Sequence, residues 1–244
     1  MSVIELDGKE IRVTVKTSTR ARKTVDIEFK SEEELVVSLP KTQEVNLEAL
    51  LKKHRDLIER KYVEYLSKVK VLEGDVILYR GMPHLIKIEH RNDSSGIPVA
   101  TEENSIVIRV SEREKSYILL KKWMTKETRD LIEDTTAKYS DQITETPVRV
   151  SVTDTQRWGY CRKNRSIVFN WQLIALPPRL AEFAILHEYV HLYYTNHQNG
   201  FHRKLSRIIP DYKQREKELR QYIAIEPNFE FKEVGIPSQS TEIS

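Results

Sequence analysis

The sequence predicts an α+β protein, in which a β-rich first part is followed by a helical part that contains a small antiparallel sheet. In the first 40 residues, apolar and polar residues alternate, which is typical of antiparallel strands with one solvent-facing side. From Asn46 onward, longer segments repeat their apolar residues at helical spacing. Short alternating runs recur between these helical segments, so strands and helices are mixed along the chain.

Three short strands are expected before Pro40, where the first alternating segment ends. Their apolar positions share one side of each strand: Ile11, Val13 and Val15; Val25, Ile27 and Phe29; Leu35, Val37 and Leu39. A helix is predicted over residues 47–66, because Asn46 is a residue type preferred at helix N-caps and apolar residues then recur at helical spacing. The segment 80–83, Arg-Gly-Met-Pro, predicts a hairpin between two further strands.

The rest of the chain is predicted to add three strands and four helices. Pro177 and Pro178 are expected to open the third long helix of the chain, because proline is favoured in the first turn of a helix. A polar loop is expected over 91–105. The remaining expected elements are strands near 106–110, 148–152 and 167–171, and helices near 119–139, 178–194, 201–209 and 211–223.

We predict three regions along the chain. Residues 1–145 form a β-rich region with two long helices, residues 146–225 form a catalytic core, and residues 226–244 form a flexible tail. A boundary near 70–75 is the alternative to the one at 145.

Composition excludes several classes of protein. The formal charge of +3 and the pI of about 8.7 do not indicate a nucleic-acid binder, which usually has a concentrated basic surface. A single cysteine excludes an internal disulfide and a zinc site built from several cysteines. No apolar run approaches the roughly 20 residues of a membrane span, and the opening residues lack an apolar signal core. We therefore expect a cytoplasmic globular protein.

The predicted third helix carries the residues that indicate chemistry. His187-Glu188-Tyr189-Val190-His191 places two imidazoles at positions i and i+4, which lie on the same face of a helix. Two such imidazoles can bind one Zn²⁺, and a glutamate beside the first can act on a zinc-bound water. Glu188 is therefore the predicted catalytic base. The alternative is a helix on which one histidine is packed and the other is exposed.

A catalytic zinc site needs a third protein ligand and an open fourth position. His197 is the favoured third ligand, because it follows His191 at a predicted helix end where the chain can turn back. His202 competes for this role but falls inside the next predicted helix, beyond Gly200. Cys161 as a fourth ligand would close the site and make it structural.

Five segments of the second half form a recognisable pattern: Arg157-Trp158-Gly159-Tyr160-Cys161, Asn170-Trp171, Pro177-Pro178, HEYVHLYYTNHQNGFH from His187 to His202, and Pro210-Asp211-Tyr212. In these segments the chain resembles the YgjP-like zinc metallopeptidases, a family related to the SprT and WLM zincins. The resemblance is strong over about 155–215. It departs from the family at Tyr160, often a small residue there, and at His202, usually an aromatic residue.

The resemblance implies a zincin-like catalytic part that holds one Zn²⁺ by His187, His191 and His197, with Glu188 as the base. The substrate would be a peptide or protein. Arg157, His202 and Tyr212 are candidates for contacting the substrate or the transition state. The strand at 166–172 is expected either to bind extended substrate at a sheet edge or to be an ordinary core strand.

Two other functions remain open at this point. A metal-dependent hydrolase could act on a nucleotide or another phosphate substrate, with the basic residues at 20–23 and Arg157 binding phosphate. A binding module without enzymatic activity could instead use zinc as a structural ion.

Overall fold

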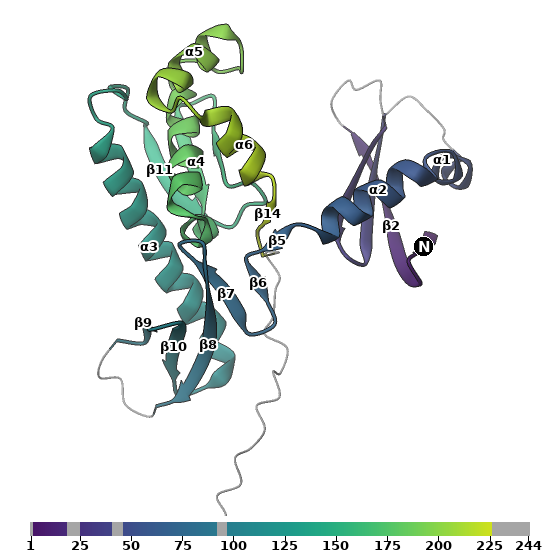
Figure 1. Cartoon of the computed structure of the whole chain (residues 1–244), viewed down its shortest axis with the longest axis horizontal. Helices are drawn as coiled ribbons and strands as arrows, with labels where there is room; N and C mark the ends of the chain where they lie inside the picture. Colours follow the sequence, from purple (N-terminus) through teal and green to yellow (C-terminus); the bar gives the residue numbers. More distant parts are fainter. Residues whose placement is uncertain (1, 19–24, 41–45, 92–96, 226–244) are drawn as a thin grey trace, which may run out of the picture. The chain divides into compact units, whose positions relative to one another are not determined.

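The computed structural model of the chain describes residues 2–18, 25–40, 46–91 and 97–225 (Figure 1). Contacts between residues divide the chain into two compact units, Met1–Lys68 and Val69–Ser244. Both units combine small sheets with helices, so the α+β prediction is confirmed. The functional boundary at residue 145 stays a prediction, and the predicted flexible tail at 226–244 lies outside the described residues.

The first unit contains a four-stranded sheet in the order β1-β2-β4-β3. Its strands are β1 (Ser2–Leu6), β2 (Lys9–Ser18), β3 (Asp26–Ser31) and β4 (Glu34–Pro40). β1 was not among the predicted strands. β2 and β4 pair in parallel, which contradicts the purely antiparallel arrangement expected, because the chain inserts β4 between β2 and β3 after the β3–β4 hairpin.

The predicted helix over 47–66 is two helices, α1 (Leu47–Lys53) and α2 (Arg55–Leu66). Asn46 caps α1 as predicted, since its side chain accepts a hydrogen bond from the Ala49 N–H. The helix breaks at His54, whose backbone leaves the helical region at φ −105° and ψ 17°. Leu51, Ile58 and Tyr62 on these helices pack in one core with the apolar side of the sheet.

The second unit begins with β5 (Val69–Lys70) and a five-stranded sheet in the order β6-β7-β8-β10-β9. The strands of this sheet are β6 (Leu72–Glu73), β7 (Val76–Tyr79), β8 (Met82–His90), β9 (Val99–Glu102) and β10 (Ser105–Val110). A 3₁₀ turn at Arg113–Lys115 precedes the long helix α3 (Ser116–Lys138), whose buried residues share a core with this sheet.

The predicted hairpin at 80–83 joins β7 to β8. Arg80 and Gly81 both have positive φ, 50° and 81°, as a two-residue turn of type I′ requires. The turn is also anchored, because the Gly81 N–H donates to the Ala175 carbonyl at 2.9 Å. A Cβ at Gly81 would lie 2.8 Å from the Cα of Pro177, so this close approach also requires glycine.

A three-stranded sheet lies next in the chain: β11 (Arg149–Thr153), β12 (Gly159–Cys161) and β13 (Ser166–Asn170), in the order β11-β13-β12. β13 pairs in parallel with β11 and antiparallel with β12. The strand predicted at 166–172 is therefore central and fully buried, so it is a core strand and not a substrate-binding edge. β12 occupies an edge.

The C-terminal part of this unit is helical. A 3₁₀ turn at Trp171–Ala175 leads into α4 (Pro178–Val190), which has proline in its first turn as predicted. α5 (Asn199–Ile208), α6 (Tyr212–Leu219) and β14 (Tyr222–Ile223) follow, and β14 pairs with β5. None of the described helices combines the length and the low polarity that a bilayer crossing demands.

Candidate metal centre

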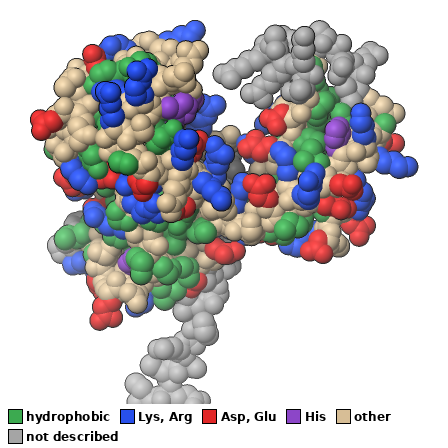
Figure 2. Space-filling view, turned by 45° about the horizontal axis from the view of Figure 1, so that its top comes forward, with side chains coloured by type: hydrophobic (Ala, Val, Ile, Leu, Met, Phe, Trp, Pro, Cys, Tyr) green, Lys and Arg blue, Asp and Glu red, His purple; other side chains and the backbone are tan. Residues whose placement is uncertain are grey.

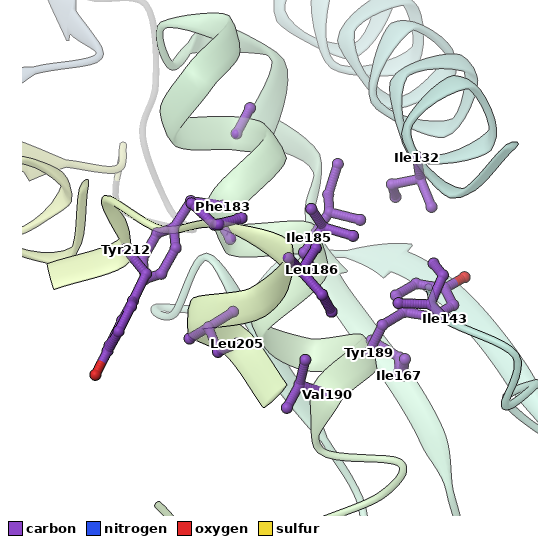
Figure 3. Packing of buried hydrophobic residues seen from close by; sticks show 14 of the residues in the cluster. Ile132, Ile143, Ile167, Phe183, Ile185, Leu186, Tyr189, Val190, Leu205 and Tyr212 are labelled. Atoms are coloured by element: carbon purple, nitrogen blue, oxygen red, sulfur yellow. The ribbon is translucent and has the colours of Figure 1, made fainter. Parts of the chain in front are cut away.

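α4 is the buried central helix of this part of the chain. Its C-terminal end carries His187–His191, which have the pattern HExxH, two histidines separated by a glutamate and two further residues. Figure 3 shows its apolar side chains packed among residues from α3, β13, α5 and α6. The labelled neighbours are Ile132, Ile143, Ile167, Leu205 and Tyr212 around Phe183, Ile185, Leu186, Tyr189 and Val190. This close packing fixes the backbone that presents His187 and His191.

Three histidines converge at the end of α4. The nearest ring nitrogens of His187, His191 and His197 all lie within 4.8 Å of one another, and the two Nε2 atoms of His187 and His197 are 2.9 Å apart. His187 and His191 are half-buried, and His197 is exposed. The helix supplies the first two rings, and the segment between α4 and α5 returns His197 to them.

Phe201 on α5 supports all three rings. Its ring centroid lies 4.9, 4.7 and 4.6 Å from those of His187, His191 and His197, and its side chain is 1% exposed. The first turn of α5 therefore packs a buried apolar ring against all three histidines and supports the cluster.

Burial favours neutral imidazoles here, and a hydrogen bond fixes the tautomer of one of them. His191 Nδ1 lies 2.9 Å from the Tyr194 carbonyl oxygen, which requires an N–H at Nδ1 and leaves Nε2 with a free lone pair. Burial, together with the neighbouring histidines, lowers the pKa of His187 to about 3. Neutral imidazole is the form that binds a metal.

The donor set fits a zinc ion. Tetrahedral coordination at 2.0–2.1 Å from each nitrogen places ligand nitrogens about 3.3 Å apart. This value lies between the 2.9 Å that separates the Nε2 atoms of His187 and His197 and the 4.8 Å within which all three ligand nitrogens lie. The three nitrogens are therefore spaced closely enough to suit such a ligand set.

The side chain of Glu188 lies against β12. Its side chain is 8% exposed, and burial raises its pKa to about 7, against the opposing effects of a backbone hydrogen bond from Cys161 and the charge of Arg157. Gly159 makes room for it, because a Cβ there would lie 2.9 Å from Glu188 Cγ. A carboxyl group with a pKa near neutrality can both accept and return a proton.

A pocket of about 270 Å³ opens beside His187 and Glu188. β12, α4, α6 and β14 form its walls through Trp158, Phe183, Leu219, Arg220 and Tyr222, among others. Its lining is largely apolar and includes a few polar side chains, those of His187, Glu188, Glu216 and Arg220, a combination typical of a substrate site.

The structure separates His202 and Tyr212 from the cluster. Their rings stack with centroids 5.8 Å apart, and Tyr212 Oη lies 3.3 Å from His202 Nδ1. The His202 ring centroid is 6.4 Å from that of His197, and the cluster found among the described residues does not include His202. The exposed Arg157 acts on Glu188 only through its charge.

Cys161 and the basic residues at 20–23 were the other candidates for metal or phosphate binding. The Cys161 thiol faces the Arg162 carbonyl at 3.6 Å and is absent from the cluster of possible ligand atoms in the described residues. The basic residues at 20–23 lie outside the described residues. Sequence reasoning missed the supporting role of Phe201 and of the Tyr194 carbonyl; the only signal was the position of Phe201, four residues after His197.

Comparison with known proteins completes this description. The model of the YgjP-like family, for its metallopeptidase domain, matches residues 23–222. A comparison with curated proteins finds no match. The family match covers most of the chain and includes the histidine cluster, Glu188 and the pocket beside them. The chain therefore belongs to the YgjP-like metallopeptidase family.

Proposed function

We propose that this chain is a zinc-dependent peptidase in which His187, His191 and His197 hold one Zn²⁺ and Glu188 is the general base. The convergence of three imidazoles beside a buried carboxyl group is the observation that carries the proposal. The family supports a metallopeptidase acting on peptide or protein substrates. A zinc ion in this donor set would supply a Lewis acid and lower the pKa of water.

Residues of the chain transfer the proton, orient the metal ligands and bind the substrate. Glu188 accepts a proton from the attacking water and passes it to the leaving amine, so one group serves both proton transfers. The Tyr194 carbonyl and Phe201 keep the imidazoles in their orientation. β12, an edge strand beside Glu188, has one side without a partner strand among the described residues, which suits the addition of an extended polypeptide.

The positive charge of Arg157 suits the negative charge that develops on the scissile carbonyl, so we assign it the transition-state contact. Tyr212 and His202 are weaker candidates, because they hydrogen-bond to each other and Tyr212 is buried.

Glu188→Gln is the first test of this mechanism. We expect bound zinc and thermal stability close to wild type, because the substitution keeps the size of the side chain and alters no proposed ligand. Peptide hydrolysis should fall about 10²–10⁴-fold, since glutamine cannot accept the proton. Metal analysis, calorimetry and a labelled-casein assay measure the three effects. Loss of zinc in this variant would instead make Glu188 a ligand.

The ligand set is tested by a matched pair of variants. His197→Ala should remove most of the bound zinc, as should His187→Ala and His191→Ala, because two imidazoles alone hold the ion weakly. His202→Ala is the control and should keep zinc near one ion per chain, since His202 pairs with Tyr212. The reverse result would move the third ligand to His202. Parallel assays with nucleoside triphosphates test the phosphate-hydrolase alternative.

A further inference from the structure

A second pocket, of about 470 Å³, lies where the segment after α4 meets α5. We call it the cationic pocket. Tyr193, Tyr194, Arg203, Lys204 and Arg207 are among the residues that line it. None of the described residues that line it carries a carboxylate, although charged residues of both signs are frequent elsewhere in the chain.

The cations occupy one side of an amphipathic helix. α5 buries Phe201, Leu205 and Ile208, and its sequence NGFHRKLSRI contains no acidic residue. Arg203 and Arg207 are exposed, one helical turn apart, and neither takes part in an ion pair among the described residues. By contrast, α4 and α6 pair their arginines Arg179 and Arg215 with carboxylates.

Lys204 is held in place by groups without charge. Its Nζ donates to the Gln142 carbonyl at 3.1 Å and lies 3.9 Å from the centroid of the Tyr193 ring. Tyr193 is itself fixed, because its hydroxyl accepts a hydrogen bond from the Glu145 N–H at 2.8 Å. The ammonium group is thus positioned without a neutralising carboxylate.

The charge of the surrounding segment is also positive. Residues 146–225 contain 13 Lys and Arg and six Asp and Glu, which gives this segment a formal charge of +7. The formal charge of the whole chain is only +3. Figure 2 shows Lys and Arg side chains (blue) around histidine atoms (purple) on the visible face of this part of the molecule. Such a surface attracts anionic ligands.

The cationic pocket is connected to the metal centre. The Tyr194 carbonyl accepts the hydrogen bond of His191, and Phe201 of α5 packs against all three histidines. Tyr194 and Gly200, which flank His197 in the chain, both line the cationic pocket, so this pocket adjoins the metal centre. A polypeptide bound across the metal centre can therefore place a side chain in the cationic pocket.

We propose that the cationic pocket binds an Asp or Glu side chain of the polypeptide substrate and so gives the enzyme a preference for acidic segments on the α5 side of the scissile bond. This inference rests on the proposed peptidase function. The two unpaired guanidinium groups supply the attraction, and Lys204 adds to it from a fixed position.

The test uses fluorescein-labelled peptides of one length that differ only in carrying four Glu or four Gln residues on one side of the cleavage site. In the Arg203→Gln/Arg207→Gln double variant, the ratio of kcat/KM for the Glu and Gln peptides should fall at least about fivefold, with the Gln peptide unaffected. In wild type, the same ratio should fall as salt is raised. Lys213→Gln is the control, because Lys213 is an exposed cation of α6 that does not line the pocket.

A binding measurement separates this inference from the peptidase function. Fluorescence anisotropy with the Glu188→Gln protein reports peptide binding whether or not a peptide is cleaved. Weaker binding of only the Glu peptide after the two arginine substitutions supports the pocket, even if no peptide is hydrolysed and the proposed function fails. An unchanged preference in the double variant overturns the inference. Tighter binding of single-stranded DNA than of the Glu peptide, lost in the double variant, overturns it in favour of a phosphate ligand.

Discussion

Gly159 decides where the carboxyl group of Glu188 can lie. It pairs with Phe169 across the β12–β13 ladder, and a Cβ at this position would lie 2.9 Å both from Glu188 Cγ and from Phe169 Cδ1. Phe169 is fully buried and cannot move aside, so a larger residue has to displace Glu188.

Gly159→Ala should therefore reduce peptide hydrolysis by at least about tenfold and destabilise the protein by about 1–3 kcal/mol, while bound zinc stays near wild type. Activity, chemical denaturation and metal content measure these effects. Tyr160→Phe on the same strand removes only a hydroxyl that accepts from Arg162 and is the control. Full activity of Gly159→Ala would show that Glu188 tolerates the shift.

At the scale of elements, Glu182 ties three helices together. This α4 residue accepts hydrogen bonds from Lys138 of α3 at 2.6 Å and from Arg215 of α6 at 2.8 Å. Burial by itself would raise the pKa of Glu182, but these two hydrogen bonds, together with Tyr139 and the charge of Lys138, outweigh it and lower the pKa. The ionised carboxylate is thus favoured in the folded state.

A lowered pKa in the folded state means that the stabilisation is present above the ordinary pKa of a glutamate and is lost as the pH falls through the folded value. Glu182→Gln should reduce stability by about 1–2 kcal/mol at pH 7, and the difference from wild type should shrink as the pH approaches 4. Urea unfolding between pH 7 and 4 measures it. Glu218→Gln removes a more exposed partner of Arg179 and should cost less. A difference that stays constant with pH would contradict the assignment.

The elements also show which parts of the structure a sequence can reveal. Helical spacing, Asn46 and the paired prolines mark α1 and α4 because these signals are local. The HExxH spacing and the following turn indicate the histidine cluster for the same reason. The parallel pairing of β2 with β4, the central position of β13 and the support from Phe201 arise from contacts distant in sequence, which hydrophobic periodicity does not encode.

At the scale of the whole molecule, the two units have separate cores. All three tryptophans, Trp123, Trp158 and Trp171, belong to the second unit, which also contains the histidine cluster. Tryptophan fluorescence therefore reports the unfolding of this unit alone.

Zinc should raise the unfolding temperature observed by tryptophan fluorescence, because an ion that binds only the folded state stabilises it. The stabilisation should approach about 2.7 kcal/mol when free zinc exceeds the dissociation constant 100-fold. Circular dichroism, which reports both units, should show an additional transition that zinc does not move. His187→Ala should abolish the shift, and an equal shift of both transitions would mean that zinc acts outside the proposed site.

The short β5–β14 pairing sets the order in which the second unit can be completed. Val69 and Lys70 pair with Tyr222 and Ile223, across about 150 intervening residues, and Gln172 also hydrogen-bonds to Ile225. Closing so long a loop is slow, and during synthesis it has to wait until residue 225 has left the ribosome. The first unit, whose contacts end at Lys68, is free to fold much earlier. The second unit, which holds the metallopeptidase site, can therefore be completed only after residue 225 has been made, later than the first unit.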